Sequence, residues 1–363
     1  MRIPMANLKL EYDSLKDQIL KEVASVLDST AFINGDPIKE FDKKVEDFLK
    51  VKHHIPCGNG TDALQIALMS LGIHPGDEII TTPFTFIATA EVIALLKAKP
   101  VFVDIDPDTL LIDVNKIEEA ITDKTFAILP VHLFGQMANM DAIMKIAKKH
   151  DLKVVEDAAQ AFGATHNGTI AGTIGDIGTI SYFPSKNLGA YGDAGGIITN
   201  NDDLAAKIKM IVNHGQNKKY EHHLIGVNSR MDTIQAAILN VKIKYINEWL
   251  KKRNAAGELY KKLLDPSIKT QTTTKGNFHT YHQFTIKYQN RDKLKKYLAD
   301  KEIASAIYYP IPLNEQKAFE NKFDYNKTPN SNKVAKEVLS LPISHFISEN
   351  EIKEVSEAVN SFI

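Results

Sequence analysis

The sequence predicts an α/β fold, with a mostly parallel sheet between helices in the first part of the chain and a smaller α+β unit after it. Three observations lead to this prediction. Between Asp77 and Asn200, short apolar runs alternate with helical patterns. These runs are almost continuously apolar, as expected when a parallel sheet is covered on both faces. From about Ile234 the pattern changes to long helical stretches with few strands.

The expected elements can be placed in order along the chain. In the first part, strands are predicted at 78–83, 101–105, 126–131, 153–157 and 178–183, and helices at 63–71, 85–97 and 140–150. In the second part, a long helix at 236–260 precedes a strand at 283–288, a helix at 292–301 and a terminal helix from about residue 349. The length of 363 residues fits two domains. We place them at 1–245 and 246–363, with the N-terminal segment as a candidate to pack on the smaller one.

The composition excludes several classes of function. Hydrophobic residues make up 44% of the chain and charged residues 25%, the balance of a soluble globular protein. The formal net charge of −1, with both signs interspersed, argues against nucleic acid or an anionic membrane as a partner. Cys57 is the one cysteine, which excludes an intrachain disulfide. No apolar segment has the length of a signal peptide or a bilayer crossing, so we expect a cytoplasmic protein.

A glycine-rich turn precedes the helix predicted at 63–71. Gly60 allows a tight turn, and the free N–H groups of a first helical turn form a site for an anion. Thr61 could add a hydroxyl to that site. Taken alone, an ordinary helix cap by Asn59, Thr61 or Asp62 is the preferred interpretation.

An acid lies at the end of the strand predicted at 153–157. The carboxyl ends of parallel strands are where ligands bind in open α/β sheets, and Asp157 lies there. A carboxylate in that position is costly to bury unless a cation or a hydrogen-bond donor meets it. The alternative is that Asp157 caps a following helix.

A lysine occupies the glycine-rich turn after the strand at 178–183. Confined there, the amine of Lys186 can have a lowered pKa and act as a Schiff-base nucleophile and proton carrier. The glycines at 189, 192 and 195 have the spacing G-x-x-G-x-x-G and open no helix. We therefore reject a nicotinamide dinucleotide site here.

Arg230 is the best candidate for holding an anionic group. The chain has four arginines, and this one lies in a polar turn. Arg253 on a polar face of the long helix and Arg291 beside a helix start are in unremarkable settings. Arg230 could grip a carboxylate or a phosphate, with a structural salt bridge as the alternative.

Together these stretches are the parts that a pyridoxal phosphate (PLP) site requires. The phosphate needs an anion cradle, the pyridine nitrogen needs an acid that keeps it protonated, and the aldehyde needs a lysine. The turn at Gly60, Asp157 and Lys186 supply one of each.

On this basis the chain resembles the DegT-type nucleotide-sugar aminotransferases, which belong to the aspartate-aminotransferase (fold type I) superfamily. The resemblance extends over essentially the whole chain and implies a large domain with a seven-stranded, mostly parallel sheet. It rests on Asn59-Gly60-Thr61-Asp62-Ala63-Leu64, Pro83-Phe84-Thr85-Phe86-Ile87-Ala88-Thr89, Glu156-Asp157-Ala158-Ala159-Gln160, Ser181 with Lys186, Asn228-Ser229-Arg230 with Gln235-Ala236-Ala237, and Tyr309-Pro310-Ile311-Pro312-Leu313.

The resemblance implies a role around the cofactor ring for four residues. Lys186 would bind PLP as a Schiff base and then carry the proton, and Asp157 would pair with the pyridinium nitrogen. Gln160 would approach the ring hydroxyl. Phe86 would stack on the ring; without the resemblance, a core position would be preferred for it.

The resemblance also implies how the phosphate is held. Gly60, Thr61, Asp62 and Ser181 would hold it through backbone amides and hydroxyls. Asn228 would reach it from the other subunit of a homodimer.

The implied reaction is a ping-pong transamination. L-glutamate would donate the amino group and leave as 2-oxoglutarate, and a nucleotide-linked 3-keto sugar would accept it. Arg230, Tyr308, Tyr309 and Asn34 are the candidate sugar contacts, although relatives often have His where this chain has Tyr308.

Two classes of nucleotide sugar are compatible with this reaction. A UDP-2-acetamido-3-keto hexose or its uronic acid, used for a bacterial surface glycan, is favoured over a dTDP-3-keto-6-deoxyhexose.

Two classes compete with this interpretation. One is a non-catalytic protein that binds PLP or a sugar and has a regulatory role. The other is a metal hydrolase, suggested by the pairs His53-His54 and His222-His223. Adjacent histidines point in different directions and no H-E-x-x-H pattern is present, which disfavours the hydrolase.

Overall fold

The computed structural model describes residues 1–320 and 328–363. The helices are α1 Leu8–Ser29, α2 Asp36–Leu49, α3 Gly60–Leu71, α4 Ala88–Leu95, α5 Met140–His150, α6 Asp202–Ile211, α7 Thr233–Lys242, α8 Ile246–Leu263, α9 Arg291–Asp300, α10 Pro329–Glu337 and α11 Glu349–Phe362. The strands are β1 His53–Cys57, β2 Glu78–Thr81, β3 Lys99–Phe102, β4 Thr125–Ile128, β5 Lys153–Asp157, β6 Thr165–His166, β7 Thr169–Ile170, β8 Ile177–Ser181, β9 Gly195–Thr199, β10 Gln216–Lys218, β11 Glu221–His222, β12 Lys269–Thr270, β13 Asn277–Phe278, β14 Phe284–Lys287 and β15 Val338–Leu341.

A seven-stranded sheet forms the centre of the larger part of the molecule. Its strand order is β1-β9-β8-β5-β4-β2-β3. The pairs from β8 to β3 are parallel, and β9 runs antiparallel to both of its neighbours. The prediction of a mostly parallel sheet between helices is therefore confirmed.

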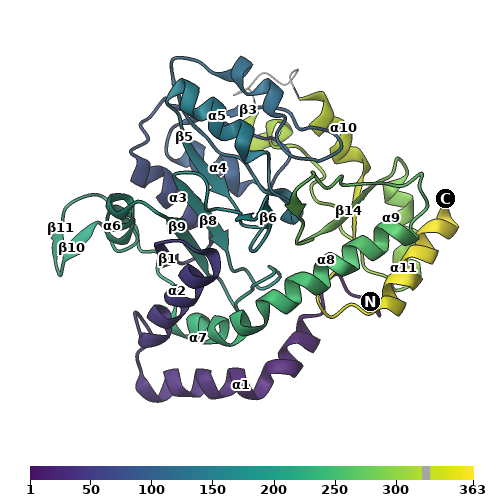
Figure 1. Ribbon diagram of the computed structural model, residues 1–363, viewed down its shortest axis with the longest axis horizontal. Coiled ribbons are helices and arrows are strands. Elements are labelled where there is room, and N and C mark those ends of the chain that lie inside the picture. Colours follow the sequence, from purple (N-terminus) through teal and green to yellow (C-terminus); the bar gives the residue numbers. More distant parts are fainter. Residues whose placement is uncertain (321–327) are drawn as a thin grey trace.

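Consecutive residues of each central strand pack on opposite faces of this sheet. Ile79 and Val155 join one apolar cluster with α3, α4 and α6, whereas Ile80 and Val154 join another with α5. Side chains alternate across a strand, so both faces must be covered to bury such continuous apolar runs. Helices cover the sheet on both sides in Figure 1.

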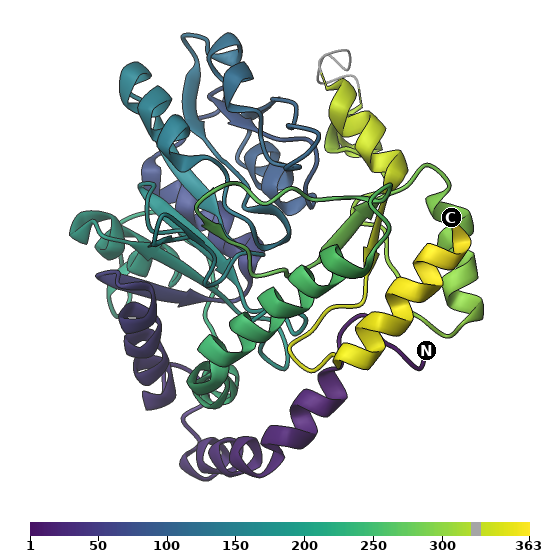
Figure 2. The ribbon, with the colours of Figure 1, turned by 45° about the vertical axis from the view of Figure 1, so that its right-hand side comes forward.

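A second core lies around the three-stranded sheet β12-β14-β15. It collects apolar residues of α8, α9 and α11 together with Ile3 from the N-terminal segment. Ile3 also forms a β-bridge with Ile303. Both chain termini lie beside α11 in Figures 1 and 2, and α8 runs from α7 to this part of the molecule.

The prediction of one continuous helix at 236–260 is wrong. The helical segment is divided at Ile243–Tyr245 by a turn of 3₁₀ helix, and α8 continues in a new direction. No glycine or proline marks the break, because the turn residues keep right-handed helical dihedrals. The direction of α8 is set by packing between the two cores, which the local pattern does not encode.

Among the helices within residues 1–320 and 328–363, none has both the length and the apolar character that crossing a membrane requires.

Candidate active site

A cavity of about 610 Å³ lies at the carboxyl ends of β5 and β8. The start of α3 and the segment before α4 contribute to its wall, as do two segments from the second part of the chain. Its lining residues are Asn59, Gly60, Thr61, Asp62, Leu64, Thr85, Phe86, Ala88, Thr89, Val131, Asp157, Ala159, Gln160, Ser181, Phe183, Ser185, Lys186, Asp193, His282, Gln283, Tyr308 and Tyr309.

Asp157 is the buried acid of this cavity. Its carboxylate accepts a hydrogen bond of 2.8 Å from the Thr89 hydroxyl and one of 3.2 Å from the Ala159 N–H. Burial raises the pKa of Asp157, and these two donors together with the nearby Lys186 only partly oppose the rise. No helix begins here, because the next residues form a turn, so the helix-cap alternative for Asp157 is wrong. A cationic ligand in the cavity would stabilise the ionised carboxylate.

Lys186 lies in the turn that follows β8. Its backbone N–H donates to the Phe183 carbonyl at 2.8 Å. Burial lowers the pKa of the Lys186 amine to about 8, against the opposing charge of Asp157. Within the described residues the amine makes no hydrogen bond. Such an amine is unprotonated often enough near neutral pH to act as a nucleophile.

The start of α3 is fitted tightly against the end of β8. The Asn59 side chain caps the helix by accepting from the Asp62 N–H at 2.8 Å, so the cap predicted among three candidates is Asn59. A Cβ atom on Gly60 would lie 2.7 Å from the Ser181 Cβ, a distance that real Cβ atoms essentially never show. Glycine at position 60 therefore permits the hydroxyls of Thr61 and Ser181 to line one end of the cavity with the free amides of α3.

Aromatic and amide groups form another part of the cavity lining. The Gln160 carbonyl oxygen accepts from the Phe134 N–H at 2.8 Å, and its amide donates to the Tyr309 hydroxyl at 3.0 Å. Phe86 is half exposed and packs at a tilt against Tyr309, with 6.2 Å between ring centroids. Tyr308 also lines the cavity.

Three predicted site residues do not line this cavity. Asn228 is exposed and forms a β-bridge with Asn213. The Arg230 guanidinium donates to the Asn213 side chain at 2.9 Å, and its buried Nε has no partner among the described residues. Asn34 is exposed in the segment between α1 and α2.

Sequence reasoning missed several residues of the site. Thr85, Thr89, His282 and Gln283 line the cavity. Thr85 and Thr89 stand in the motif at 83–89 but were given no role there, and His282 and Gln283 belong to none of the motifs. Arg253 was wrongly placed on a polar helix face, since it is 3% exposed. The adjacent Lys251, Lys252 and Asn254 give this part of the helix a polar appearance, but the Arg253 side chain is buried against the backbone of Tyr281 and His282.

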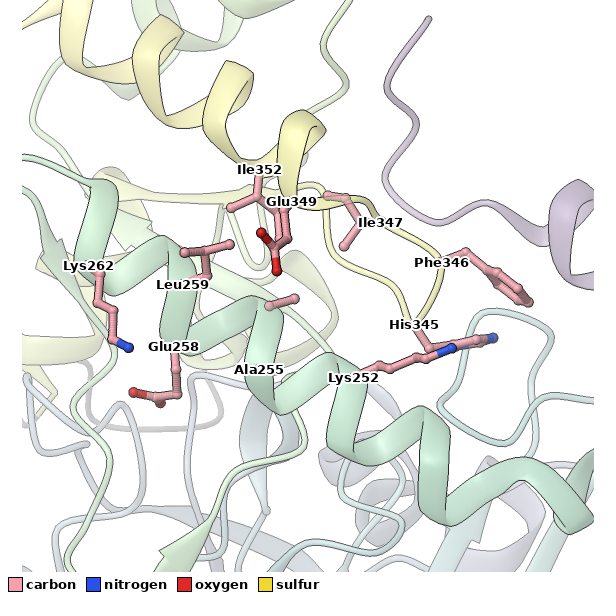
Figure 3. A pocket seen from close by; sticks show the side chains of 11 residues that line it. Lys252, Ala255, Glu258, Leu259, Lys262, His345, Phe346, Ile347, Glu349 and Ile352 are labelled. Carbon is pink, nitrogen blue, oxygen red and sulfur yellow. The ribbon is translucent and has the colours of Figure 1, made fainter.

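A second cavity, of about 600 Å³, lies between α8 and the start of α11. Figure 3 shows Lys252, Ala255, Glu258 and Leu259 on α8 opposite Ile347, Glu349 and Ile352. It shares no lining residue with the cavity at Lys186.

The histidine pairs form ordinary contacts. His53 meets Asp202 at 2.7 Å and His54 meets Asp42 at 2.8 Å. Over residues 1–320 and 328–363, no three acidic, histidine or cysteine side chains are grouped so that they could hold a metal ion.

The family model of the DegT/DnrJ/EryC1/StrS aminotransferase family matches residues 13–360. The chain is 46% identical to a protein named pleiotropic regulatory protein from Geobacillus stearothermophilus, over 100% of this chain and 99% of the other. It is 42% identical to the UDP-2-acetamido-2-deoxy-3-oxo-D-glucuronate aminotransferase of Pseudomonas aeruginosa, over 99% and 100%. It is 39% identical to the dTDP-3-amino-3,6-dideoxy-alpha-D-galactopyranose transaminase of Aneurinibacillus thermoaerophilus, over 99% of each.

Solved structures agree with these relatives. A DegT DnrJ EryC1 StrS aminotransferase from Brucella abortus superimposes with a TM-score of 0.97 at 35% identity, covering 99% of both chains. NtdA from Bacillus subtilis, with bound cofactor PMP, has a TM-score of 0.89 at 34% identity and covers 95% of this chain and 81% of its own.

The cavity fits the cofactor of this family. Asp157 is a buried acid with a raised pKa, which a cationic group would stabilise in its ionised form. Lys186 has an amine with a lowered pKa that can form a Schiff base. Gly60 leaves space beside the amides and hydroxyls at the start of α3. These are the groups that the ring nitrogen, the aldehyde and the phosphate of PLP need. The chain belongs to the DegT/DnrJ/EryC1/StrS aminotransferase family and is a PLP-dependent sugar aminotransferase with the type I fold.

Proposed function

We propose that this enzyme moves the amino group of L-glutamate to C3 of a UDP-linked 2-acetamido-3-keto hexose, or of its uronic acid, for a bacterial surface glycan. The observation that carries the choice of sugar is the 42% identity, over nearly the full length of both chains, to an aminotransferase named for a UDP-2-acetamido-3-oxo-glucuronate. The lined cavity with Lys186 and Asp157 supports the choice of reaction.

Lys186 is the proposed attachment point of PLP and the proton carrier. When bound, PLP supplies an electron sink that acidifies the C–H bond beside the transferred amino group. The amine of Lys186, with its pKa lowered to about 8, can take that proton and return it at another carbon.

Asp157 is proposed to hold the ring nitrogen in its protonated form. The Thr89 hydroxyl and the Ala159 N–H orient the carboxylate, so it can meet the ring without reorganising. Gln160 is fixed by Phe134 and Tyr309 and would approach the ring hydroxyl. Phe86 would cover the ring.

Gly60, Thr61, Asp62 and Ser181 are proposed to bind the phosphate. The first amides of α3 and two hydroxyls line the same end of the cavity. Helix N-termini stabilise anions through these unpaired N–H groups and the helix dipole.

We also propose a homodimer in which Asn228 completes the phosphate site of the partner. Asn228 does not line the cavity of its own chain. Apolar side chains that could be covered by a second copy are exposed on α1 and just after it, among them Leu20, Leu27, Phe32 and Ile33. Asn34 follows directly in the chain, so it too would be brought to a dimer interface.

Tyr308, Tyr309 and Arg230 are the proposed sugar contacts. The two tyrosines line the cavity. Arg230 has a buried Nε without a partner in the described part of the chain, so a carboxylate or a phosphate could satisfy it. A uronic acid offers that carboxylate.

A dTDP-3-keto-6-deoxyhexose is the second candidate substrate, favoured by the 39% identity to a dTDP-sugar transaminase. A non-catalytic regulatory role is set aside, although a relative at 46% identity is named a regulatory protein, because the chain belongs to an aminotransferase family. Lys186 and Asp157 in one cavity agree with catalysis.

The test is the absorbance spectrum of the purified protein with PLP. We expect a visible band that L-glutamate removes, and that a UDP-2-acetamido-3-keto sugar then restores. Restoration by a dTDP-3-keto sugar alone would transfer the assignment to the second candidate. A band that glutamate leaves unchanged would contradict L-glutamate as the amino donor. The Lys186→Ala variant should lack the band, whereas Lys244→Ala, an exposed control, should keep it.

A further inference from the structure

Thr85 and Thr89 are buried threonines in the lining of the cavity, at 2% and 1% exposure. The residues around them in the sequence, Ile87, Ala88 and Ala90, are apolar. A valine would have almost the same shape at either position and would need no hydrogen-bond partner. Burying a hydroxyl costs free energy unless it is hydrogen-bonded, so the contacts of these two hydroxyls need an explanation.

The Thr89 hydroxyl bonds to a residue that is distant in the sequence. Threonine hydroxyls in and near helices often bond to backbone groups of nearby residues. Thr89 lies in the first turn of α4, yet its Oγ1 donates to the Asp157 Oδ2 at 2.8 Å. The Thr85 hydroxyl lies 3.2 Å from the Thr89 hydroxyl. The two threonines and Asp157 therefore form one continuous chain of hydrogen bonds.

An ionised Asp157 fixes the direction of both hydrogen bonds in this chain. An ionised carboxylate can only accept, so Thr89 donates its one hydroxyl proton to Asp157. The Thr89 oxygen is then left as an acceptor, and Thr85 is the donor of the second bond. Hydrogen bonds in such a chain polarise one another, so the Thr85 hydroxyl strengthens the bond that Thr89 makes to the carboxylate.

The chain acts on the charge of Asp157. Burial raises the pKa of Asp157, and the Thr89 hydroxyl opposes this rise more strongly than the Ala159 N–H or the charge of Lys186 does. A hydrogen bond to the ionised form of an acid favours that form. The ionised carboxylate is the form that can pair with a protonated ring nitrogen.

We propose that Thr85 and Thr89 are positioning residues for Asp157: Thr85 donates to Thr89, Thr89 donates to Asp157, and this chain keeps the proton of the ion pair on the ring nitrogen of PLP. Phe86, which would cover the ring, lies between the two threonines in the sequence. The segment 85–89 would thus serve the face of the ring directly and its nitrogen through Asp157. The inference rests on the proposed role of Asp157 but not on the identity of the sugar.

The first measurement is the position of the proton between the cofactor and Asp157. The full-length protein is loaded with PLP that carries ¹⁵N at the ring nitrogen, and the ¹⁵N chemical shift at pH 7 separates a protonated ring nitrogen from a neutral one. Without the Thr89 donor the carboxylate is a stronger base and draws the proton toward itself. In Thr89→Val we expect the ratio of protonated to neutral ring nitrogen to fall about tenfold, which corresponds to one hydrogen bond to a charged group.

Two further variants follow the chain of hydroxyls. Thr85→Val should lower the same ratio by about threefold, because it removes only the donor that polarises Thr89. Thr89→Ser keeps the hydroxyl and should stay close to the wild-type ratio. Thr89→Ala, which also lacks the hydroxyl, replaces Thr89→Val if that variant does not fold.

Thr81→Val is the matched control. Thr81 is fully buried and its hydroxyl donates to the Leu129 carbonyl at 2.8 Å, but it does not line the cavity. A lower ratio in Thr89→Val that Thr81→Val does not show supports the proposal. An unchanged ratio in Thr89→Val, or an equal change in both variants, overturns it in favour of hydroxyls that only tie α4 to β5. An effect of Thr89→Val with none in Thr85→Val overturns it for Thr85.

The second measurement is the rate at which L-glutamate removes the visible band of the PLP-loaded protein. A protonated ring nitrogen makes the cofactor a better electron sink. We expect the maximal rate to fall about tenfold in Thr89→Val, with little change in the L-glutamate concentration that gives half of it, and to recover in Thr89→Ser. A rise in that concentration alone would contradict a role through Asp157.

Asp157→Asn separates failure of this inference from failure of the proposed role of Asp157. An amide has no charge to pair with the ring nitrogen, so the ratio should be lowest in this variant. If Asp157→Asn keeps the wild-type ratio, the proposed role of Asp157 is what fails. If Asp157→Asn lowers the ratio and Thr89→Val does not, only the inference about the threonines is wrong.

Discussion

Asp157 and Lys186 show how one buried environment shifts the pKa values of two residues in opposite directions. Loss of water disfavours the charged form of each, which raises the pKa of Asp157 and lowers that of Lys186. The charge of each residue partly offsets the pKa shift of the other. In such a cavity the acid can pair with a cationic ring, and the amine can accept and donate a proton near neutral pH.

The rate at which Lys186 captures PLP should follow its own ionisation. The ammonium form, which cannot attack the aldehyde, dominates below the pKa of about 8. We therefore expect the rate of covalent attachment to rise with pH, by nearly tenfold per unit well below 8, and to level off above it. Stopped-flow absorbance at a series of pH values measures this rate. A rate that keeps rising to pH 10 would show that the amine has an ordinary pKa.

Glu156, next to Asp157 but on the opposite face of β5, should make folding sensitive to acid. Its carboxylate meets His132 at 2.8 Å and accepts from the amides of Gly172, Ile174 and Gly175. Burial by itself would raise the pKa of Glu156, but the His132 contact and these amides outweigh it and lower the pKa below 4.5. The stabilisation is therefore complete above pH 4.5 and is lost as the pH falls further.

The Glu156→Gln variant tests this dependence. We expect it to lower the free energy of unfolding at pH 7 by about 3 kcal/mol, since a buried hydrogen-bonded pair is broken. It should also flatten the fall in stability below pH 4.5. Urea unfolding between pH 3 and 7 measures both effects, with Glu40→Gln, a change of an exposed side chain on α2, as the control. Equal acid sensitivity in the wild type and Glu156→Gln would contradict the assignment.

At the scale of elements, a buried lysine joins α7 to α1 and to the turn that carries Lys186. The Lys242 ammonium lies 2.5 Å from the Glu11 carboxylate and donates to the Gly189 carbonyl at 2.5 Å. It also lies over the Tyr191 ring, 4.0 Å from the centroid. This contact adds to the apolar contacts of Leu15 and Ile19, which join α1 to the cluster that includes α7.

Removing Lys242 should therefore be costly. We expect Lys242→Met to lower the free energy of unfolding by about 3–5 kcal/mol, because Glu11 is left buried without its cation. The double variant with Glu11→Gln should recover part of this loss. Thermal and urea unfolding provide the measurement, and Lys244→Met, two positions away and exposed, should change stability by less than about 0.5 kcal/mol. An equally small effect for Lys242→Met would mean that the pair is not formed.

Elements with strong local signals could be predicted from the sequence. The helix at 140–150, the strand at 153–157 and the start of the terminal helix at 349 agree with α5, β5 and α11. Each has a clear cap or a continuous apolar run, such as the Ser348 capping box of α11. The break between α7 and α8 has no such signal, because it follows from packing between distant segments.

At the scale of the whole molecule, the same distinction applies to the candidate site. Lys186, Asp157 and Gly60 could be suggested from the sequence because each lies at the end of a recognisable element. His282 and Gln283 could not, since they reach the cavity only when the second part of the chain packs against the large sheet. The fold and the reaction class could therefore be predicted from the sequence, whereas the part of the cavity lining that includes His282 and Gln283 could not.

The proposed dimer makes a prediction that only two chains together can test. Asn228 and Lys186 of one chain do not share a cavity, so Lys186→Ala and Asn228→Ala should disable different components of each site. In a dimer of the two variants, one site combines both defects and the other has neither. Random reassociation of equal amounts should then restore roughly a quarter of the wild-type turnover, because half of the dimers are mixed and each has one intact site.

Each variant by itself supplies the control for this experiment. Lys186→Ala should be inactive alone, and Asn228→Ala should bind PLP at least tenfold more weakly alone. Turnover of L-glutamate with a keto sugar is measured before and after mixing, with dimer mass checked by light scattering. If mixing gives no more than the sum of the two variants, Asn228 acts within its own chain or not at all. The phosphate would then be held by the Thr61 and Ser181 hydroxyls and the amides of α3 alone. A dimer that covers the exposed apolar residues of α1 would then not be required for catalysis.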